Sequence, residues 1–188
     1  MSLPTQSKPS LSPAKRRRIR LFKLVLYAIL GTLMFTSKLI MEAIPNIHLL
    51  GMLIMVYTLV FRWEALIPIY VYVLMDGVRA GFNAWWVPYL YIWTILWSVT
   101  MLLPKRMPKR LAAVIYSAVC TLYGLLYGVL YAPAQALIWG LDFHGMLLWI
   151  AQGISFDILH GVGNLVASLL ILPLSDLLGR LMRKYTSQ

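Results

Sequence analysis

The residues with the greatest potential for chemistry lie close together in an apolar segment near the end of the chain. Asp157, His160 and Asn164 follow one another at i, i+3 and i+7, so they share one face of a helix. An acid, an imidazole and an amide on one face could relay a proton, bind a ligand or join neighbouring helices. A charged group at membrane depth usually faces a bundle interior or a water-filled cavity, so we expect this face to point inward.

Enzymatic chemistry would need other spacings. Ser155 and Asp157 are two residues apart on the expected helix, so they do not share a face and cannot form a nucleophilic triad with His160. The chain has three histidines, no two of them at i, i+4 spacing, and two lie in predicted loops, which argues against a metal site. Gly161 and Gly163 lie in mid-helix and indicate close packing rather than a phosphate-binding loop. We therefore expect no enzyme activity, no metal and no cofactor.

The composition of the chain is that of an integral membrane protein. Its 188 residues are 61% hydrophobic and only 12% charged, whereas a soluble domain rarely contains more than about half apolar residues. At roughly 20 residues per span, this length allows about six helices and no large soluble domain. The single cysteine, Cys120, excludes an intrachain disulfide and is expected to be a small packing residue.

One membrane domain, residues 21–178, is expected between two basic cytoplasmic tails, a disordered one at 1–20 and a second at 179–188. Prolines and glycines mark the breaks between spans, because the residue before a proline disfavours the helical region. Pro173 is expected to close the last span, and a longer connection is expected from 132 to 145, around Pro133. The predicted spans cover about 21–43, 48–61, 65–78, 84–103, 111–131 and 146–172.

The distribution of charge predicts the orientation. The net charge is +11, and most basic residues flank the apolar segments, which indicates membrane orientation rather than binding to nucleic acid. If the amino terminus is cytoplasmic, every Lys and Arg except Lys38 and Arg79 falls on the cytoplasmic side. The positive-inside rule then predicts an all-α, six-transmembrane-helix bundle with both termini in the cytoplasm.

On the outer half, three charged residues are candidates for ligand contacts. Lys38 and Glu42 are four residues apart on the first predicted helix, so they could pair with each other or face a ligand. Arg79 could bind a carboxylate or a phosphate, or could simply end the third helix.

The fourth predicted helix has an aromatic face. Trp86, Tyr89 and Trp93 lie at i, i+3 and i+7. Such a face suits either an interfacial belt or a stacking wall for a flat heterocycle.

Small residues at four-residue spacing mark two helices. Ala28, Thr32 and Thr36 repeat on the first helix, and Gly124 and Gly128 on the fifth. Small residues let helix backbones approach closely, so either face could pack within the bundle or dock a separate membrane subunit.

The layout as a whole resembles the substrate-binding membrane subunit (S component) of energy-coupling factor (ECF) vitamin transporters. The resemblance covers about 22–178 and rests on the six spans, the basic cytoplasmic amino terminus and the face formed by Ala28, Thr32 and Thr36. It also rests on the stretch 38–48 with its Ile-Pro-Asn turn, and on 153–160 followed by Asn164.

The family implies a high-affinity binder of a vitamin or related micronutrient in a bacterial plasma membrane, without catalysis of its own. Its first helix would dock a transmembrane coupling (T) subunit that is attached to two cytoplasmic ATPases. The family's docking motif is more often rich in alanine, and this chain has Thr32 and Thr36 instead.

The expected function is therefore capture of a vitamin-like small molecule at the outer face of a lipid membrane, for ATP-driven uptake by partner subunits. The expected substrate contacts are Trp86, Tyr89, Trp93, Trp149, Gln152, Asp157 and His160, with Lys38, Glu42 and Arg79 as outer candidates. Two alternatives stay open: a self-contained proton-coupled carrier or channel that uses Asp157 and His160, and a structural or assembly protein of the membrane. In the last case these residues only join helices.

Overall fold

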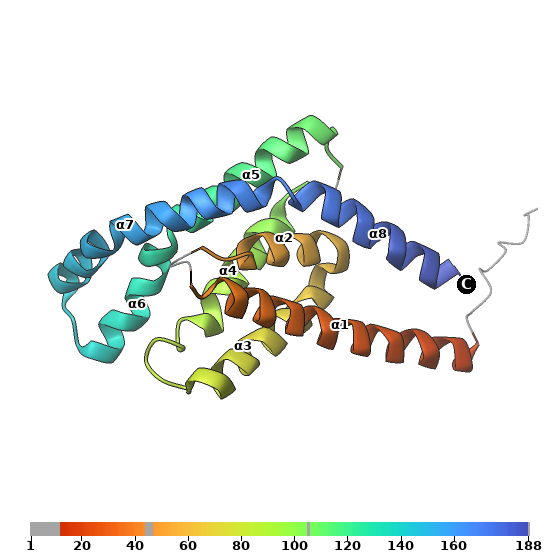
Figure 1. The fold of residues 1–188 in the computed structure, drawn as a ribbon, viewed down its shortest axis with the longest axis horizontal. Helices are drawn as coiled ribbons and strands as arrows, with labels where there is room; N and C mark the ends of the chain where they lie inside the picture. Colours follow the sequence, from red (N-terminus) through yellow and green to blue (C-terminus); the bar gives the residue numbers. More distant parts are fainter. Residues whose placement is uncertain (1–11, 44–46, 105, 188) are drawn as a thin grey trace, which may run out of the picture.

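A computed structural model describes residues 12–43, 47–104 and 106–187, and every regular element in these ranges is a helix. The elements in chain order are α1 (Pro13–Met41), α2 (Leu50–Phe61), the short 3-10 helix η1 (Arg62–Ala65), α3 (Leu66–Ala80), α4 (Tyr89–Leu102), α5 (Lys109–Leu125), α6 (Tyr127–Trp139), α7 (Phe143–Ser168) and α8 (Ile171–Ser187) (Figure 1). The all-α prediction is confirmed for the described part of the chain.

Four helical stretches in the described ranges are long and apolar enough to cross a membrane. They are Pro13–Met41, Leu50–Ala80, Lys109–Trp139 and Phe143–Ser168. The helix Tyr89–Leu102 is also apolar but shorter. The chain therefore has the membrane-spanning character that its composition predicts.

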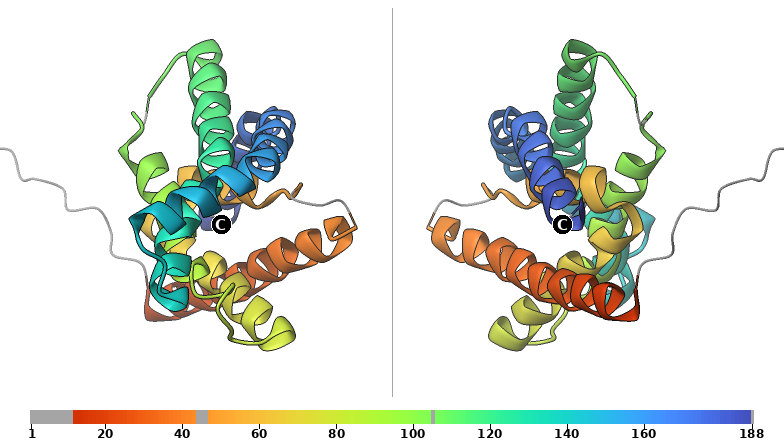
Figure 2. Two further views of the ribbon diagram at one scale, coloured as in Figure 1. Left: turned by 90° about the vertical axis from the view of Figure 1, so that its left-hand side faces the viewer. Right: turned by 90° about the vertical axis from the view of Figure 1, so that its right-hand side faces the viewer.

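The helices form two groups with α2 between them. α1 packs against α3, while α7 packs against α5 and α6. The end-on views of Figure 2 show α1 and α3 on one side of the molecule and α5 and α7 on the other. Nearly every residue of α2 is buried, because α4 and α8 also pack on it.

The two ends of the described chain lie at the same end of the molecule. In Figure 1 the first turn of α1 and the last turn of α8 both lie at the right, and the turn between α6 and α7 lies at the left. We call the right-hand end the basic end, because α1 has Lys15, Arg16, Arg17 and Arg18 there and α8 has Arg180, Arg183 and Lys184.

The first helix begins earlier than predicted. The side chain of Ser12 accepts the backbone N–H of Lys15 at 3.3 Å, and Pro13 occupies the first position, where its fixed φ suits a helix. Residues 13–20, which we expected in a disordered tail, therefore form the first turns of α1. The rest of that predicted tail, 1–11, lies outside the described residues, as does the predicted Pro45-Asn46 turn.

The predicted end of the last span at Pro173 is wrong, and the basic residues predicted to follow it as a tail belong to a helix, α8. α7 ends at Ser168, and Pro173 lies in the first turn of α8, where a missing N–H costs no helical hydrogen bond. α8 then packs on α2, and the ring of Tyr185 stacks on Phe22 of α1 at 3.6 Å between centroids.

The predicted connection 132–145 is also wrong, because most of it belongs to α6. The fifth span does not continue straight through 131: the helix breaks at Leu126 and restarts as α6, which has Pro133 inside it. The true turn between α6 and α7 is short, with Gly140 at φ 65° and Asp142 as the N-cap of α7.

Candidate ligand-binding pocket

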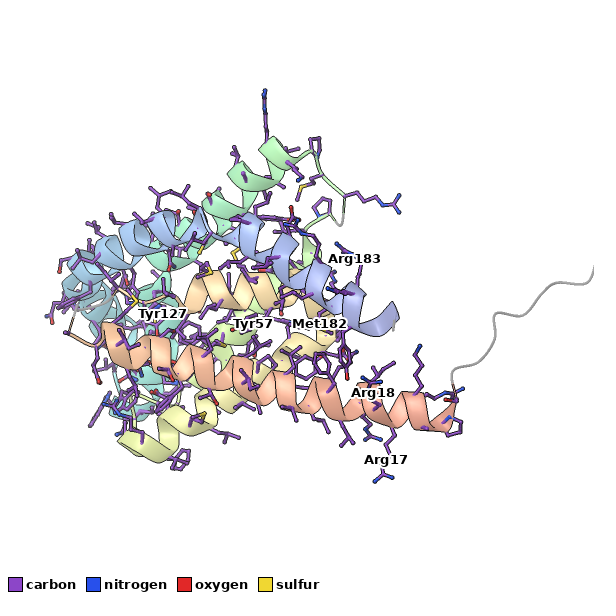
Figure 3. The ribbon with its side chains drawn as sticks, turned by 45° about the vertical axis from the view of Figure 1, so that its right-hand side comes forward. Arg17, Arg18, Tyr57, Tyr127, Met182 and Arg183 are labelled. Atoms are coloured by element: carbon purple, nitrogen blue, oxygen red, sulfur yellow. The ribbon has the colours of Figure 1, made fainter. Side chains whose placement is uncertain are left out.

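A cavity of about 380 Å³ lies between α6 and α7, away from the basic end. Four aromatic side chains form its walls: Tyr127, Tyr131, Trp149 and Phe156. Three polar side chains converge on it: Gln152, Asp157 and His160. Figure 3 labels Tyr127 at the end of the molecule opposite to Arg17, Arg18 and Arg183. Both the volume and the mixture of aromatic walls with a few polar groups are those of a small-molecule site.

Asp157 is held at the break between α5 and α6. Its Oδ1 accepts the backbone N–H of Gly128 at 2.8 Å. Gly128 is the second residue of α6, and the first N–H groups of a helix lack intrahelical acceptors. A carboxylate at a helix amino terminus also interacts favourably with the helix dipole. Residue 128 is necessarily glycine in this geometry, because a Cβ there would overlap the Asp157 carboxylate.

His160 pairs with a histidine from the segment before α2. The Nε2 atoms of His160 and His48 lie 3.1 Å apart, so one imidazole donates and the other accepts. The His160 ring stacks on Tyr127 with 4.5 Å between centroids.

The same face of α7 continues as a set of bonds to α5. Asn164 Nδ2 donates to the carbonyl of Cys120 at 3.0 Å, and Ser168 Oγ bonds to Ser117 Oγ at 2.8 Å. Asp157 and His160 thus line the cavity, whereas Asn164 joins two helices. Gly124 faces α7 as well, and a Cβ there would lie 2.8 Å from Asn164 Nδ2, so the glycine pair on this helix packs within the bundle.

Behind the pocket is a buried aromatic cluster. Trp93 is 1% exposed, and its ring lies 5.4 Å from Tyr89, 5.9 Å from Tyr127 and 6.0 Å from His48. The Trp93 Nε1 is buried without a hydrogen-bond partner in the described part of the chain. Trp93 and Tyr89 therefore support the pocket from behind but do not line it.

Trp86 has a different role from the one predicted by its spacing. Its Nε1 donates to the carbonyl of Val73 at 2.9 Å, and its ring packs edge-on against Phe82. These contacts join α3 to the start of α4. Trp86 is not brought to the pocket.

Lys38 and Glu42 do not pair with each other, contrary to one of the two expectations. Lys38 Nζ lies 2.6 Å from Asp76 Oδ1, and Glu42 pairs with Arg79 at 2.7 Å. The reason is that α1 packs along α3, which presents an opposite charge to each residue. The Arg79 guanidinium holds the pKa of the Glu42 carboxyl below its ordinary value. Lys38, Glu42 and Arg79 do not line the pocket.

The small-residue face of α1 lies on the outside of the described structure. Ala28, Thr32 and Thr36 are exposed, and Thr32 Oγ1 donates to the Ala28 carbonyl at 2.9 Å. Packing on α3 uses Gly31 instead, where a Cβ would lie 2.6 Å from Val71. This face borders α3, since Thr32 Oγ1 lies 3.9 Å from Met75 Sδ, but its three residues stay exposed.

A larger cavity, of about 650 Å³, lies at the basic end between α2, α5 and α8. Its rim includes the exposed pair of Lys109 and Asp176, 3.4 Å apart, and one aromatic side chain, Tyr116. This cavity lacks the facing aromatic walls of the pocket between α6 and α7, so it is the weaker candidate despite its size. In the described ranges, no group of three or more His, Cys, Asp or Glu side chains is placed to hold a metal ion.

Four of the predicted contacts meet at the pocket: Trp149, Gln152, Asp157 and His160. Two tyrosines of its wall, Tyr127 and Tyr131, were not predicted. Their signal was present in the sequence, since Tyr123, Tyr127 and Tyr131 recur at four-residue spacing. No protein-family model, curated protein or solved structure matches this chain.

Proposed function

We propose that the chain is the substrate-binding membrane subunit of an ECF-type importer, which captures a vitamin or related micronutrient at the outer face of a bacterial plasma membrane. The observation that carries this proposal is the pocket of about 380 Å³ between α6 and α7. Its aromatic walls suit a flat ring, and its three polar side chains suit orientation of that ring.

The proposed topology has six spans and both termini in the cytoplasm. The basic residues of α1 and α8 gather at one end of the molecule (Figure 1), as the positive-inside rule requires of a cytoplasmic end. The pocket lies away from that end, so in this topology it belongs to the outer half and receives its ligand from outside the cell.

The proposed partner surface is the exposed face of Ala28, Thr32 and Thr36. Small residues permit close approach of another helix in lipid. In the proposed complex this face docks the transmembrane coupling subunit, and the two cytoplasmic ATPases attached to that subunit drive uptake. The chain itself then needs only to bind.

Ligand binding is tested with the purified full chain in detergent. A panel of water-soluble vitamins and flat heterocycles is titrated while tryptophan fluorescence is recorded, because Trp149 lines the pocket. We expect one compound to quench the fluorescence at sub-micromolar concentration and not to do so in Trp149→Ala. A panel without any such compound, or a response equal in Trp149→Ala, contradicts the proposal.

A second candidate, a proton-coupled carrier, is favoured by one observation. His48 and His160 are 3.1 Å apart through their Nε2 atoms, and Asp157 is one helical turn from His160. Three ionisable groups in such a series suit a proton relay. Liposomes containing only this chain decide between the two functions, since a binding subunit does not accumulate substrate under a pH gradient and a carrier does.

A further inference from the structure

The pocket between α6 and α7 has the opposite charge character from the chain as a whole. The net charge of the protein is +11, yet the acidic and basic side chains of the pocket lining are one acid, Asp157, and one imidazole, His160. No Lys or Arg lines the pocket among the described residues. A phosphate or carboxylate ligand would need such a partner, because buried anions are normally paired.

The two cations expected on the outer half, Lys38 and Arg79, are already in ion pairs. Lys38 is bonded to the fully buried Asp76 and lies over the rings of Trp85 and Tyr89, 5.3 Å from each centroid. Tyr131 then separates this ion pair from the pocket, since its hydroxyl donates to the Trp85 carbonyl while its ring lines the pocket wall. Neither Lys38 nor the Arg79 paired with Glu42 is free to meet an anion.

One of the two carboxylate oxygens of Asp157 is left to accept a hydrogen bond from a ligand. The residue is 7% exposed, and its Oδ1 takes the N–H of Gly128. Its Oδ2 has no hydrogen-bond partner among the described residues. A buried carboxylate with a single hydrogen bond is costly in a membrane, and a cationic ligand compensates that cost.

The walls suit the same kind of ligand. The rings of Tyr131 and Trp149 are nearly parallel, with 4° between their planes and 6.0 Å between centroids. Tyr127 and Phe156 complete the aromatic surface. Aromatic faces attract cations and stack on flat rings, so they and the carboxylate favour the same charge.

We propose that the pocket takes a planar organic cation, such as an aromatic amine or amidine, whose positive group binds Asp157 Oδ2 and whose ring lies against the aromatic walls. This inference rests on the proposed binding function and names the charge class of its substrate. The bound cation serves as the counterion of Asp157, which the described residues of the fold do not supply.

Three probes of one size and shape test this charge preference: benzamidine, which is cationic, benzamide, which is neutral, and benzoate, which is anionic. Each is titrated into the purified full chain in detergent, with tryptophan fluorescence as the readout. We expect benzamidine to bind at least about tenfold more tightly than benzamide, and benzoate to bind least, because hydrogen bonds between charged groups are stronger than neutral ones.

The decisive variant is Asp157→Asn, which keeps an oxygen for the Gly128 N–H and loses the charge. It should abolish the advantage of benzamidine over benzamide. Its matched control is Asp142→Asn on the same helix, since Asp142 Oδ1 also accepts a backbone N–H, that of Gly145 at 2.7 Å, but lies outside the pocket. The control should keep the wild-type order of affinities.

The outcomes separate this inference from the function on which it rests. Tighter binding of benzamide or benzoate than of benzamidine by the wild type overturns the cation preference and leaves the binding function standing. An advantage of benzamidine that survives in Asp157→Asn overturns the assignment to Asp157. If none of the probes binds but a flat neutral or anionic compound from the vitamin panel does, the cation preference is overturned alone. If no compound binds at all, the cation preference and the binding function are both overturned.

Discussion

At the scale of single residues, Asp157 combines a structural hydrogen bond with a free oxygen at the pocket. The hydrogen bond from Gly128 to Asp157 leads to a prediction that is independent of any ligand. Asp157→Ala leaves the buried N–H of Gly128 without an acceptor and should destabilise the protein by about 1–3 kcal/mol. Asp157→Asn retains the acceptor and should lose much less. Thermal unfolding in detergent compares the two variants, and equal stability would contradict the assigned bond.

Two glycines that line the same pocket make a matched pair of substitutions. A Cβ at Gly128 would overlap the carboxylate of Asp157, whereas a Cβ at Gly153 meets no atom within 4 Å. Gly128→Ala should therefore cost about 1–3 kcal/mol through overpacking. Gly153→Ala should be neutral or stabilising by up to about 1 kcal/mol, because alanine favours a helix. Unfolding midpoints measure both, and a Gly128→Ala protein as stable as Gly153→Ala would show that α6 and α7 are further apart than described.

At the scale of elements, α1 and α3 are joined by ion pairs of unequal burial. Asp76 is fully buried against Lys38, whereas Glu42 and Arg79 are largely exposed. Lys38→Met leaves a buried carboxylate unpaired and should destabilise the protein by about 3–5 kcal/mol. Adding Asp76→Asn to Lys38→Met should restore most of that loss, because the unpaired charge is removed.

The exposed pair is the control for this cycle. Glu42→Gln should change the unfolding midpoint little at pH 7, since exposed ion pairs contribute little. Because Arg79 lowers the pKa of Glu42, the small contribution of this pair is present above the ordinary pKa of a glutamate and is lost as the pH falls through the lowered value. For the buried pair, the Lys38→Met, Asp76→Asn double variant is compared with Lys38→Met alone. A double variant that is no more stable would contradict the ion pair between Lys38 and Asp76.

Hydropathy and charge predicted the existence of most helices but not their breaks. Apolar runs of about 20 residues identify helices directly. A segment inside the lipid must satisfy its own backbone hydrogen bonds, and a helix does so. The break at Leu126 falls on neither a proline nor a glycine, although Gly124 and Gly128 flank it. It depends on Asp157, 31 residues later, which supplies an acceptor for the restarted helix. The kink at Arg62, with φ 58°, likewise depends on α4, where Trp97 Nε1 donates to the Arg62 carbonyl.

The candidate site was predictable to a similar degree. Spacing on α7 identified Asp157 and His160 as one face, since helical periodicity is a local property. It could not identify His48 as the partner of His160, because these residues are 112 positions apart and meet only through the packing of α2 and α7. The same limit applies to Lys38: its i+4 neighbour was visible in the sequence, whereas Asp76 became its partner through the packing of α1 on α3.

At the scale of the whole molecule, the proposed binding pocket and the proposed docking face lie on different helices. The pocket lies between α6 and α7, and the exposed small-residue face belongs to α1. Thr32→Trp should therefore leave ligand affinity of the purified chain unchanged and should reduce uptake, and recovery of partner subunits from membranes, by tenfold or more. Val166→Trp, at a position on α7 that is 64% exposed, is the control and should affect neither. Equal uptake by both variants would exclude the α1 face as the docking surface.

The central claim, that this membrane protein holds one small molecule between α6 and α7, is tested most directly by native mass spectrometry of the purified full chain. The expected result is a single small organic molecule bound to the wild type at one per chain. It should be absent from Trp149→Ala and retained by the control Trp63→Ala, which changes an exposed tryptophan outside the pocket. Circular dichroism confirms that both variants are folded. A ligand retained equally by Trp149→Ala, or a wild-type protein that neither carries nor binds any small molecule, would contradict the claim.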